Sequence, residues 1–498
     1  MINLSIKKLQ RVMRALRYSG LVLCVLLFYG YAPYEEVPGI SSISHSDLMK
    51  TVEFLSSPEL EGRLSGGEGY NKAAEFAADR FASLNLEPFG TDKYFQYLNV
   101  EYNEIKGPGT LKFIHENSER EFQLGKDFTF RGFTGSGNLT ADVVFCGYGL
   151  SRPDIGYNDY AGVDVKDKIV MVFKGIPSWK LNDSAWTNTY PREKSSVAAR
   201  YGARGILLIS NAAPIGSVLH GPGEQNEKFP QLEVSPSAAD DFLAESGYTV
   251  KELQSNIDSL HKPISVKLKT KAHINVNTTY VKDQKTMNVA ALIEGNDPVL
   301  KDEYVIIGAH LDHVGSQAGK IYFPGANDNA SGSAAVLEIA EAFIKGNIKP
   351  KRSVVFVLFA SEEQGLFGAS HFAEHSGIPP ERITAMLNLD CIGHGDKLQL
   401  GNGKSAPELW KKIKSIDSAS VKITVNSTWG GGGADAEPFH KKGIPCAYFA
   451  STKSYTYLHV PEDKPETLNK SLFEKITKLA FLSAFEISAG NYNREEVK

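Results

Sequence analysis

Residues 304–312 read YVIIGAHLD, an apolar run that ends in a histidine and an aspartate. A continuous apolar run of this length is typical of a strand that is covered on both faces of a parallel sheet. The same pattern returns at Ser353–Ala360, which is followed by Ser361 and two glutamates, and at Ala385–Leu389, which is followed by Asp390. These three strands predict one buried sheet with polar side chains along its edge.

Segments with helical periodicity separate the apolar strands. Strands that alternate with helices indicate βαβ units, so we expect an α/β fold with a mostly parallel mixed sheet flanked by helices. A fourth strand is expected at Ala447–Phe449. The expected helices of this part are Ser333–Phe343, Gly368–His375, Ala406–Ser415 and Lys470–Ser488.

The chain before this sheet contains two kinds of sequence. From Ser46, apolar residues recur at helical spacing and predict two amphipathic helices, the second over Ala73–Leu84. Over about Ala141–Val276, short apolar strands such as Val143–Cys146 indicate a separate β-rich module. This module shows no cluster of histidines and carboxylates at its strand ends.

Side chains able to bind a metal ion follow the predicted strands. In open α/β sheets, ligands bind beyond the carboxyl ends of the strands. Nitrogen and oxygen donors together suit zinc, with cobalt or manganese as competitors. Taken singly, each residue has an ordinary explanation, such as a helix cap for Asp328 or a turn for Asp390, but their recurrence at successive strand ends favours a metal site. The candidates are His310, Asp312, Asp328, Glu362, Glu363, Asp390 and His459.

Five short motifs occur in order along this part of the chain. They resemble those of the M28 family of metallopeptidases, the di-zinc aminopeptidase-like enzymes, and the resemblance covers roughly residues 46–486. The motifs are GAHLDHVG at 308–315, GANDNASG at 325–332, ASEEQGLFG at 360–368, NLD at 388–390 and HVPED at 459–463.

The resemblance implies a site with two zinc ions and an aminopeptidase that removes N-terminal residues from peptides. Asp328 would bridge the two ions, and Glu362 would be the general base toward a hydroxide held between them. Asp312 would orient the ring of His310. One ion would be bound by His310, Asp328 and Asp390, and the other by Asp328, Glu363 and His459.

Two further motifs resemble the protease-associated (PA) domain that many M28 peptidases carry as an insertion. They are DYAGVDV at 159–165 and AARYGARG at 198–205. The resemblance implies a PA-like domain at residues 141–276. It would interrupt a discontinuous peptidase domain formed by residues 46–138 and 280–490.

One loop departs from the family pattern. Family members often have Ser-Asp-His where this chain has Ala434–Ala436, and a tyrosine that stabilises the oxyanion in some relatives is replaced by Gly431. Oxyanion stabilisation would then come from the zinc ions or from another group. Trp429, Tyr455 and Tyr457 are expected either to line an apolar pocket or to pack in the core or at its rim.

The first 32 residues have the features of an export leader. Five basic residues and no acidic one accompany the apolar run Leu21–Ala32, which at 12 residues is shorter than the ~20 residues of a membrane-spanning helix. Without these five residues the chain has 49 basic against 58 acidic residues, a net charge of −9 instead of −4. We expect an exported protein that is periplasmic, extracellular or tethered to a membrane by this segment.

Other classes of protein fit the sequence less well. No basic stripe is present to follow a nucleic acid, and the four cysteines are too scattered for a disulfide framework. We expect Cys146, Cys391 and Cys446 to be buried free thiols. The inverted zinc motif HFAEH at 371–375 lies in a predicted helix, away from the strand ends.

Three related functions stay open beside the aminopeptidase. One is a glutaminyl cyclase-like transferase, and another is a non-catalytic receptor-like relative. Such relatives lose metal ligands, whereas none is missing in this chain. The third is a carboxypeptidase, which would need a cation to bind the substrate carboxylate. Only three arginines follow Thr286, and none lies in a ligand motif, so recognition of a free amine is favoured.

Overall fold

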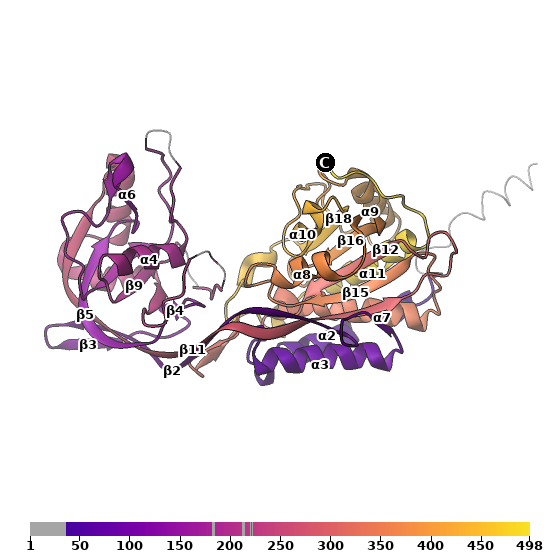
Figure 1. Ribbon diagram of the computed structural model, residues 1–498, viewed down its shortest axis with the longest axis horizontal. Helices are drawn as coiled ribbons and strands as arrows, with labels where there is room; N and C mark the ends of the chain where they lie inside the picture. The colour runs from indigo at the N-terminus through magenta and orange to yellow at the C-terminus, as the bar shows by residue number, and fades with distance from the viewer. Residues whose placement is uncertain (1–35, 182–184, 212–214, 220, 222) are drawn as a thin grey trace, which may run out of the picture.

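The computed structural model describes residues 36–498 except 182–184, 212–214, 220 and 222, so the predicted leader at residues 1–32 lies outside the described residues. The described chain forms two lobes that are joined by a long β-ribbon (Figure 1). The ribbon consists of β2 (Phe95–His115) and β11 (Ser265–Ile293), which pair antiparallel. Because β11 pairs with strands of both lobes, one continuous sheet runs through the molecule.

The larger lobe is built on the predicted mostly parallel sheet. Strands β18, β16, β12 and β15 lie side by side and run parallel, and β11 and β17 pair antiparallel at either end. The predicted α/β fold is therefore confirmed. The bounds are β12 (Tyr304–His310), β15 (Ser353–Phe359), β16 (Ile383–Leu389), β17 (Leu398–Gly401) and β18 (Cys446–Ser451).

Helices cover both faces of this sheet, which explains why its strands are apolar throughout. Val305 and Ile307 pack in the core under α2, α3, α7, α9 and α11, whereas Ile306 between them packs in the core under α8 and α10. The bounds are α2 (His45–Leu55), α3 (Glu68–Ser83), α7 (Gly332–Lys345), α8 (Phe367–His375), α9 (Pro407–Ala419), α10 (Ala436–Lys441) and α11 (Lys470–Ser488).

The smaller lobe holds a second parallel sheet. Strands β5, β8, β9 and β10 run parallel, and β4 pairs antiparallel with β10. Helix α4 packs on one face, and α5 and α6 pack on the other. The bounds are β4 (Phe128–Phe130), β5 (Gly137–Cys146), β8 (Ile169–Phe173), β9 (Gly205–Ile209), β10 (Gln231–Val234), α4 (Pro191–Arg200), α5 (Pro236–Leu243) and α6 (Val250–Leu260).

The sequence analysis missed α5 and α6 in this lobe. A local signal for α6 is present, because Thr249 and Glu252 form a capping box. Short strands complete the fold: β1 (Glu87–Pro88), β3 (Ser118–Glu121), β6 (Ser151–Arg152), β7 (Tyr157–Asn158), β13 (Ser316–Gln317) and β14 (Ile321–Tyr322).

Two further expectations concern the whole chain. Cys146, Cys391 and Cys446 are buried and free, as predicted. Over residues 36–498, gaps excepted, none of the helices has the length and hydrophobicity that a membrane span requires.

Candidate metal centre

The carboxyl ends of neighbouring parallel strands bring the five predicted ligands together. His310 is the last residue of β12, Glu363 lies in the turn after β15, and Asp390 follows β16 directly. Asp328 lies in the turn before α7, and His459 lies in a loop after β18. All five side chains border one cavity of about 600 Å³, which we call the metal cavity.

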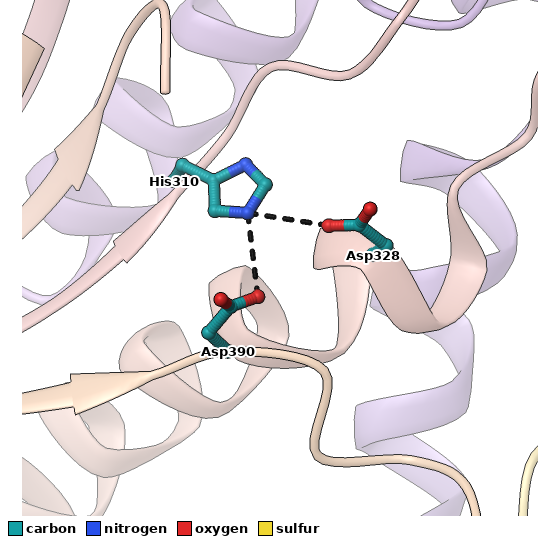
Figure 2. Close-up of side chains that lie close together, drawn as sticks. All are labelled: His310, Asp328 and Asp390. Carbon is teal, nitrogen blue, oxygen red and sulfur yellow. Dashed lines mark ion pairs between the residues drawn. The ribbon is translucent and has the colours of Figure 1, made fainter. Parts of the chain in front are cut away.

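The first donor group consists of His310, Asp328 and Asp390 (Figure 2). Nε2 of His310 lies 3.3 Å from Oδ1 of Asp328 and 3.4 Å from Oδ1 of Asp390. Donors placed tetrahedrally about 2.0–2.1 Å from a zinc ion lie about 3.3 Å from one another, so this spacing fits zinc. Oδ1 of Asp390 is buried without a hydrogen-bond partner among the described residues, while Oδ2 accepts a hydrogen bond of 2.5 Å from the hydroxyl of Tyr448.

The second donor group uses the other carboxylate oxygen of Asp328. Nε2 of His459 lies 3.1 Å from Oδ2 of Asp328 and 2.9 Å from Oε2 of Glu363. A second imidazole, His313, lies against the same carboxylates, with Nδ1 2.8 Å from Oε1 of Glu363 and 3.8 Å from Oδ2 of Asp328. The two carboxylate oxygens of Asp328 therefore belong to different donor groups. His313 was not predicted as a ligand from the sequence, although it stands in the same motif as His310.

Two of the buried carboxyls, Asp328 and Glu363, have pKa values below their ordinary ones. Burial by itself raises the pKa of a carboxyl, but the imidazoles of His310 and His459 lower the pKa of Asp328 well below its ordinary value. Burial acts the same way on Glu363, and His459 nevertheless lowers its pKa to about 2. These buried carboxylates require nearby positive charge, from protonated imidazoles or from metal cations.

Asp312 holds the turn that carries the two glutamates. Its carboxylate accepts hydrogen bonds from the backbone N–H groups of Glu362, at 3.1 Å, and of Glu363, at 3.3 Å. From the sequence, this carboxylate was expected to orient the ring of His310. Instead, Nδ1 of His310 lies 3.2 Å from the backbone carbonyl oxygen of Asp312 and 3.8 Å from its carboxylate.

Glu362 differs from its neighbour in having a free carboxylate. Its side chain is partly buried and borders the metal cavity. In the part of the chain that the structure describes, this carboxylate accepts no hydrogen bond and belongs to neither donor group. Burial, together with the charge of Glu363, raises the pKa of Glu362 well above its ordinary value, against the opposing effect of His310.

Two charged residues that the sequence analysis missed hold the ligand loops. Asp463, the last residue of the HVPED motif, accepts hydrogen bonds from the backbone N–H groups of Asn327, at 2.9 Å, and Asp328, at 3.0 Å. Arg63 is fully buried, and its guanidinium reaches chain segments that are far apart in the sequence. Its guanidinium donates to the backbone carbonyls of Leu55, Leu311, Pro324 and Gly325.

The aromatic residues expected near the site separate into two sets. Trp429 and Tyr455 border the metal cavity. The ring of Tyr457 lies instead 5.3 Å from that of His394. The imidazoles of the inverted zinc motif, at 371 and 375, stack 4.4 Å apart on α8, outside both donor groups.

The chain is similar to known peptidases in sequence and fold. The sequence profile of peptidase family M28 matches residues 288–484. Aminopeptidase YwaD of Bacillus subtilis (strain 168) is 23% identical over 384 residues, which are 73% of this chain and 71% of that protein. An aminopeptidase of Pseudomonas aeruginosa (strain UCBPP-PA14) is 26% identical over 357 residues, 69% of this chain and 56% of that protein.

A solved structure shares the fold over nearly the whole described chain. BSAP, a zinc aminopeptidase from Bacillus subtilis, superposes with a TM-score of 0.63 at 18% identity, over 93% of this chain and 98% of the BSAP chain. The segment that matches the family profile contains every residue of the two donor groups. The chain therefore contains a segment, residues 288–484, that matches peptidase family M28 and holds the whole candidate metal centre.

Proposed function

We propose that this protein is a zinc-dependent aminopeptidase that removes N-terminal residues from peptides. The observation that carries the proposal is the pairing of two donor groups through Asp328, beside a glutamate whose carboxylate is free. His310, Asp328 and Asp390 would hold one ion, and Asp328, Glu363 and His459 the other. The similarity to proteins named aminopeptidases supports the same activity.

The metal ligands, Glu362 and Asp312 would have different roles in the hydrolysis of the peptide bond. When bound, the two ions would polarise the carbonyl of the peptide bond and make a water nucleophile available near neutral pH. Glu362 accepts the proton of the attacking water and then delivers it to the nitrogen of the leaving amine. Asp312 holds the backbone of Glu362 and Glu363 in place. The carboxylate of Glu362 can therefore face the cavity while the carboxylate of Glu363 lies among the metal ligands.

The activity can be tested with one pair of substrates. The zinc-loaded protein is expected to release free leucine from an unblocked leucyl peptide and to leave its N-acetylated form intact. Dialysis against a chelator is expected to remove the activity, and added zinc to restore it. Cleavage of the blocked peptide alone would contradict the aminopeptidase assignment, and ring closure of an N-terminal glutamine without hydrolysis would favour a cyclase.

The domain division and the location of the protein are part of the proposal. We infer that a PA-like domain, predicted over residues 141–276, is inserted into the peptidase domain, supported by the two PA-like motifs and the separate apolar cores of the smaller lobe. The lobe itself begins before residue 141, because Phe128, Phe130 and Leu139 belong to one of these cores. The basic leader with its short apolar run supports export, with release or membrane tethering. Mass spectrometry of the N-terminus after expression would show whether the leader is removed.

A further inference from the structure

A second cavity of about 430 Å³ lies beside the metal cavity, and no step proposed above uses it. Its size is within the ~300–1,000 Å³ of small-molecule and cofactor sites. Three parts of the fold line it: the β-ribbon, the smaller lobe, and the chain segment that follows the two glutamates. The lining residues used below are Glu101, Phe133, Tyr190, Arg192, Gln364 and Phe367.

The two cavities meet at Gly365, which borders both of them. This glycine has a φ of +127°, which side-chain-bearing residues rarely adopt. A Cβ placed there would meet only the ring of Phe367, at 3.8 Å, so the space beside Gly365 is open. Because Gly365 has no side chain, none of its atoms beyond the backbone stands in the way of a ligand that extends from the metal cavity toward the second cavity.

Exposed apolar side chains gather at these two cavities. Tyr190 and Phe367 in the second cavity are 50% and 48% exposed, and Tyr455 and Leu458 in the metal cavity are 61% and 36% exposed. Leaving large apolar groups in water is unfavourable, so exposed apolar side chains that gather at a cavity favour the binding of an apolar ligand there. Their placement along both cavities indicates a ligand with apolar groups that is longer than one residue.

The charged groups of the second cavity are already paired. The guanidinium of Arg192 donates to both carboxylate oxygens of Glu101, at 3.0 and 2.9 Å, and lies 4.4 Å from the centre of the Phe133 ring. Tyr280 donates a further hydrogen bond of 2.6 Å to Glu101. Because these charges are neutralised within the protein, the cavity offers no strong attraction to a charged side chain and suits an uncharged one.

We propose that the second cavity binds the residues that follow the cleaved bond. It would select peptides of at least three residues that carry apolar or aromatic side chains at the second or third position. This inference rests on the proposed aminopeptidase activity, because the N-terminal residue must occupy the metal cavity. Gln364 connects the two cavities structurally. Its side-chain amide donates a hydrogen bond of 2.6 Å to the backbone carbonyl of Glu101 and so fixes the turn that carries Glu362 against the wall of the second cavity.

The first test compares substrates on the zinc-loaded full chain. For the unaltered protein, kcat/KM for Leu-Phe-Phe-Ala is expected to be more than tenfold that for Leu-Asp-Asp-Ala. In the Phe367→Ala and Tyr190→Ala variants, this ratio is expected to be about tenfold lower. Tyr248→Ala is the matched control, because Tyr248 is 41% exposed on the smaller lobe and borders neither cavity. Equal ratios in all four proteins would overturn the inference.

A binding measurement separates this inference from the proposed function. Calorimetry with Leu-Phe-Phe-Ala on the Glu362→Gln variant measures occupancy of the cavities without turnover. Adding Phe367→Ala to this variant is expected to weaken binding about tenfold, whereas unchanged binding would overturn the inference. If the unaltered protein fails to cleave leucyl-p-nitroanilide, the aminopeptidase proposal falls, and this binding result still decides the role of the second cavity.

Discussion

His313 and Glu363 share a buried hydrogen bond, with Nδ1 of His313 lying 2.8 Å from Oε1 of Glu363. The other oxygen of Glu363 faces Nε2 of His459, at 2.9 Å. Two imidazoles therefore contact one carboxylate, one at each oxygen, and their ring centres are 5.6 Å apart. The second donor group can be completed by either histidine, and the choice can be tested by mutation.

We expect His459 to be the metal ligand and His313 to support Glu363. The His459→Ala variant should then bind one zinc ion per chain where the unaltered protein binds two. The matched variant is His313→Asn, whose amide keeps a donor near the position of Nδ1 and should retain both ions. Elemental analysis after gel filtration measures the stoichiometry. The reverse pattern would transfer the ligand role to His313.

Removing the proposed base should separate metal binding from catalysis. Because the carboxylate of Glu362 lies outside both donor groups, Glu362→Gln is expected to keep its zinc content. Its kcat should be lower by a factor of about 10²–10⁴, which is the usual contribution of a general base. Glu374→Gln is the control, since this glutamate is exposed on α8. Wild-type kcat in the Glu362→Gln variant would show that another group moves the proton.

The parts of the fold that could be predicted are those with local signals. The strand that ends at His310 and the helix Lys470–Ser488 are apolar in a pattern that one segment reveals by itself, and the structure confirms both. The ribbon strands β2 and β11 were not predicted as long strands. They extend between the lobes, where much of their surface meets water, so the apolar pattern that marks a buried strand is broken.

In the candidate site, too, the residues with a local sequence signal could be predicted and the others could not. Asp328 and Asp390 could be selected because each stands at the end of an element with a clear pattern. His313 could not be separated from His310 by spacing, because both follow the same strand. The role of Arg63 depends on carbonyls that lie up to 262 residues away along the chain, and no local pattern reports such contacts.

Arg63 should be required for stability as well as for the site. Its guanidinium is fully buried and satisfies backbone carbonyls on both sides of the ligand loops, including Leu311 at 2.9 Å and Pro324 at 2.8 Å. Arg63→Met leaves these carbonyls unpaired and is expected to lower the free energy of unfolding by about 3–5 kcal/mol.

Denaturant unfolding of the zinc-free protein measures this effect without a contribution from metal binding. The control is Arg120→Met, because Arg120 and its partner Asp241 form an exposed ion pair that should contribute at most about 1 kcal/mol. Similar losses in both variants would show that the carbonyls around Arg63 are satisfied in another way. A zinc titration of the folded Arg63→Met variant should also show weaker binding, because the loops that carry the ligands lose a shared anchor.

Glu338 on α7 should make stability depend on pH. Burial, with the neighbouring carboxylate of Glu341, raises the pKa of Glu338 to about 7, from an ordinary value of 4.5. The folded protein therefore holds this proton more tightly than the unfolded chain does. By linkage, the free energy of unfolding must fall as the pH rises from about 4.5 to about 7.

The Glu338→Gln variant should remove this part of the pH dependence, because glutamine does not titrate. Between pH 5 and pH 8, both proteins can change in stability, but the free energy of unfolding of the unaltered protein should fall more than that of the variant. The difference between the two decreases should be up to about 3 kcal/mol. Urea unfolding at the two pH values measures the difference on the zinc-free protein. Glu75→Gln, an exposed position on α3, should keep the original dependence. An unchanged dependence in Glu338→Gln would mean that Glu338 is already ionised in the folded protein at pH 5, held in that state by the guanidinium of Arg80 at 3.5 Å.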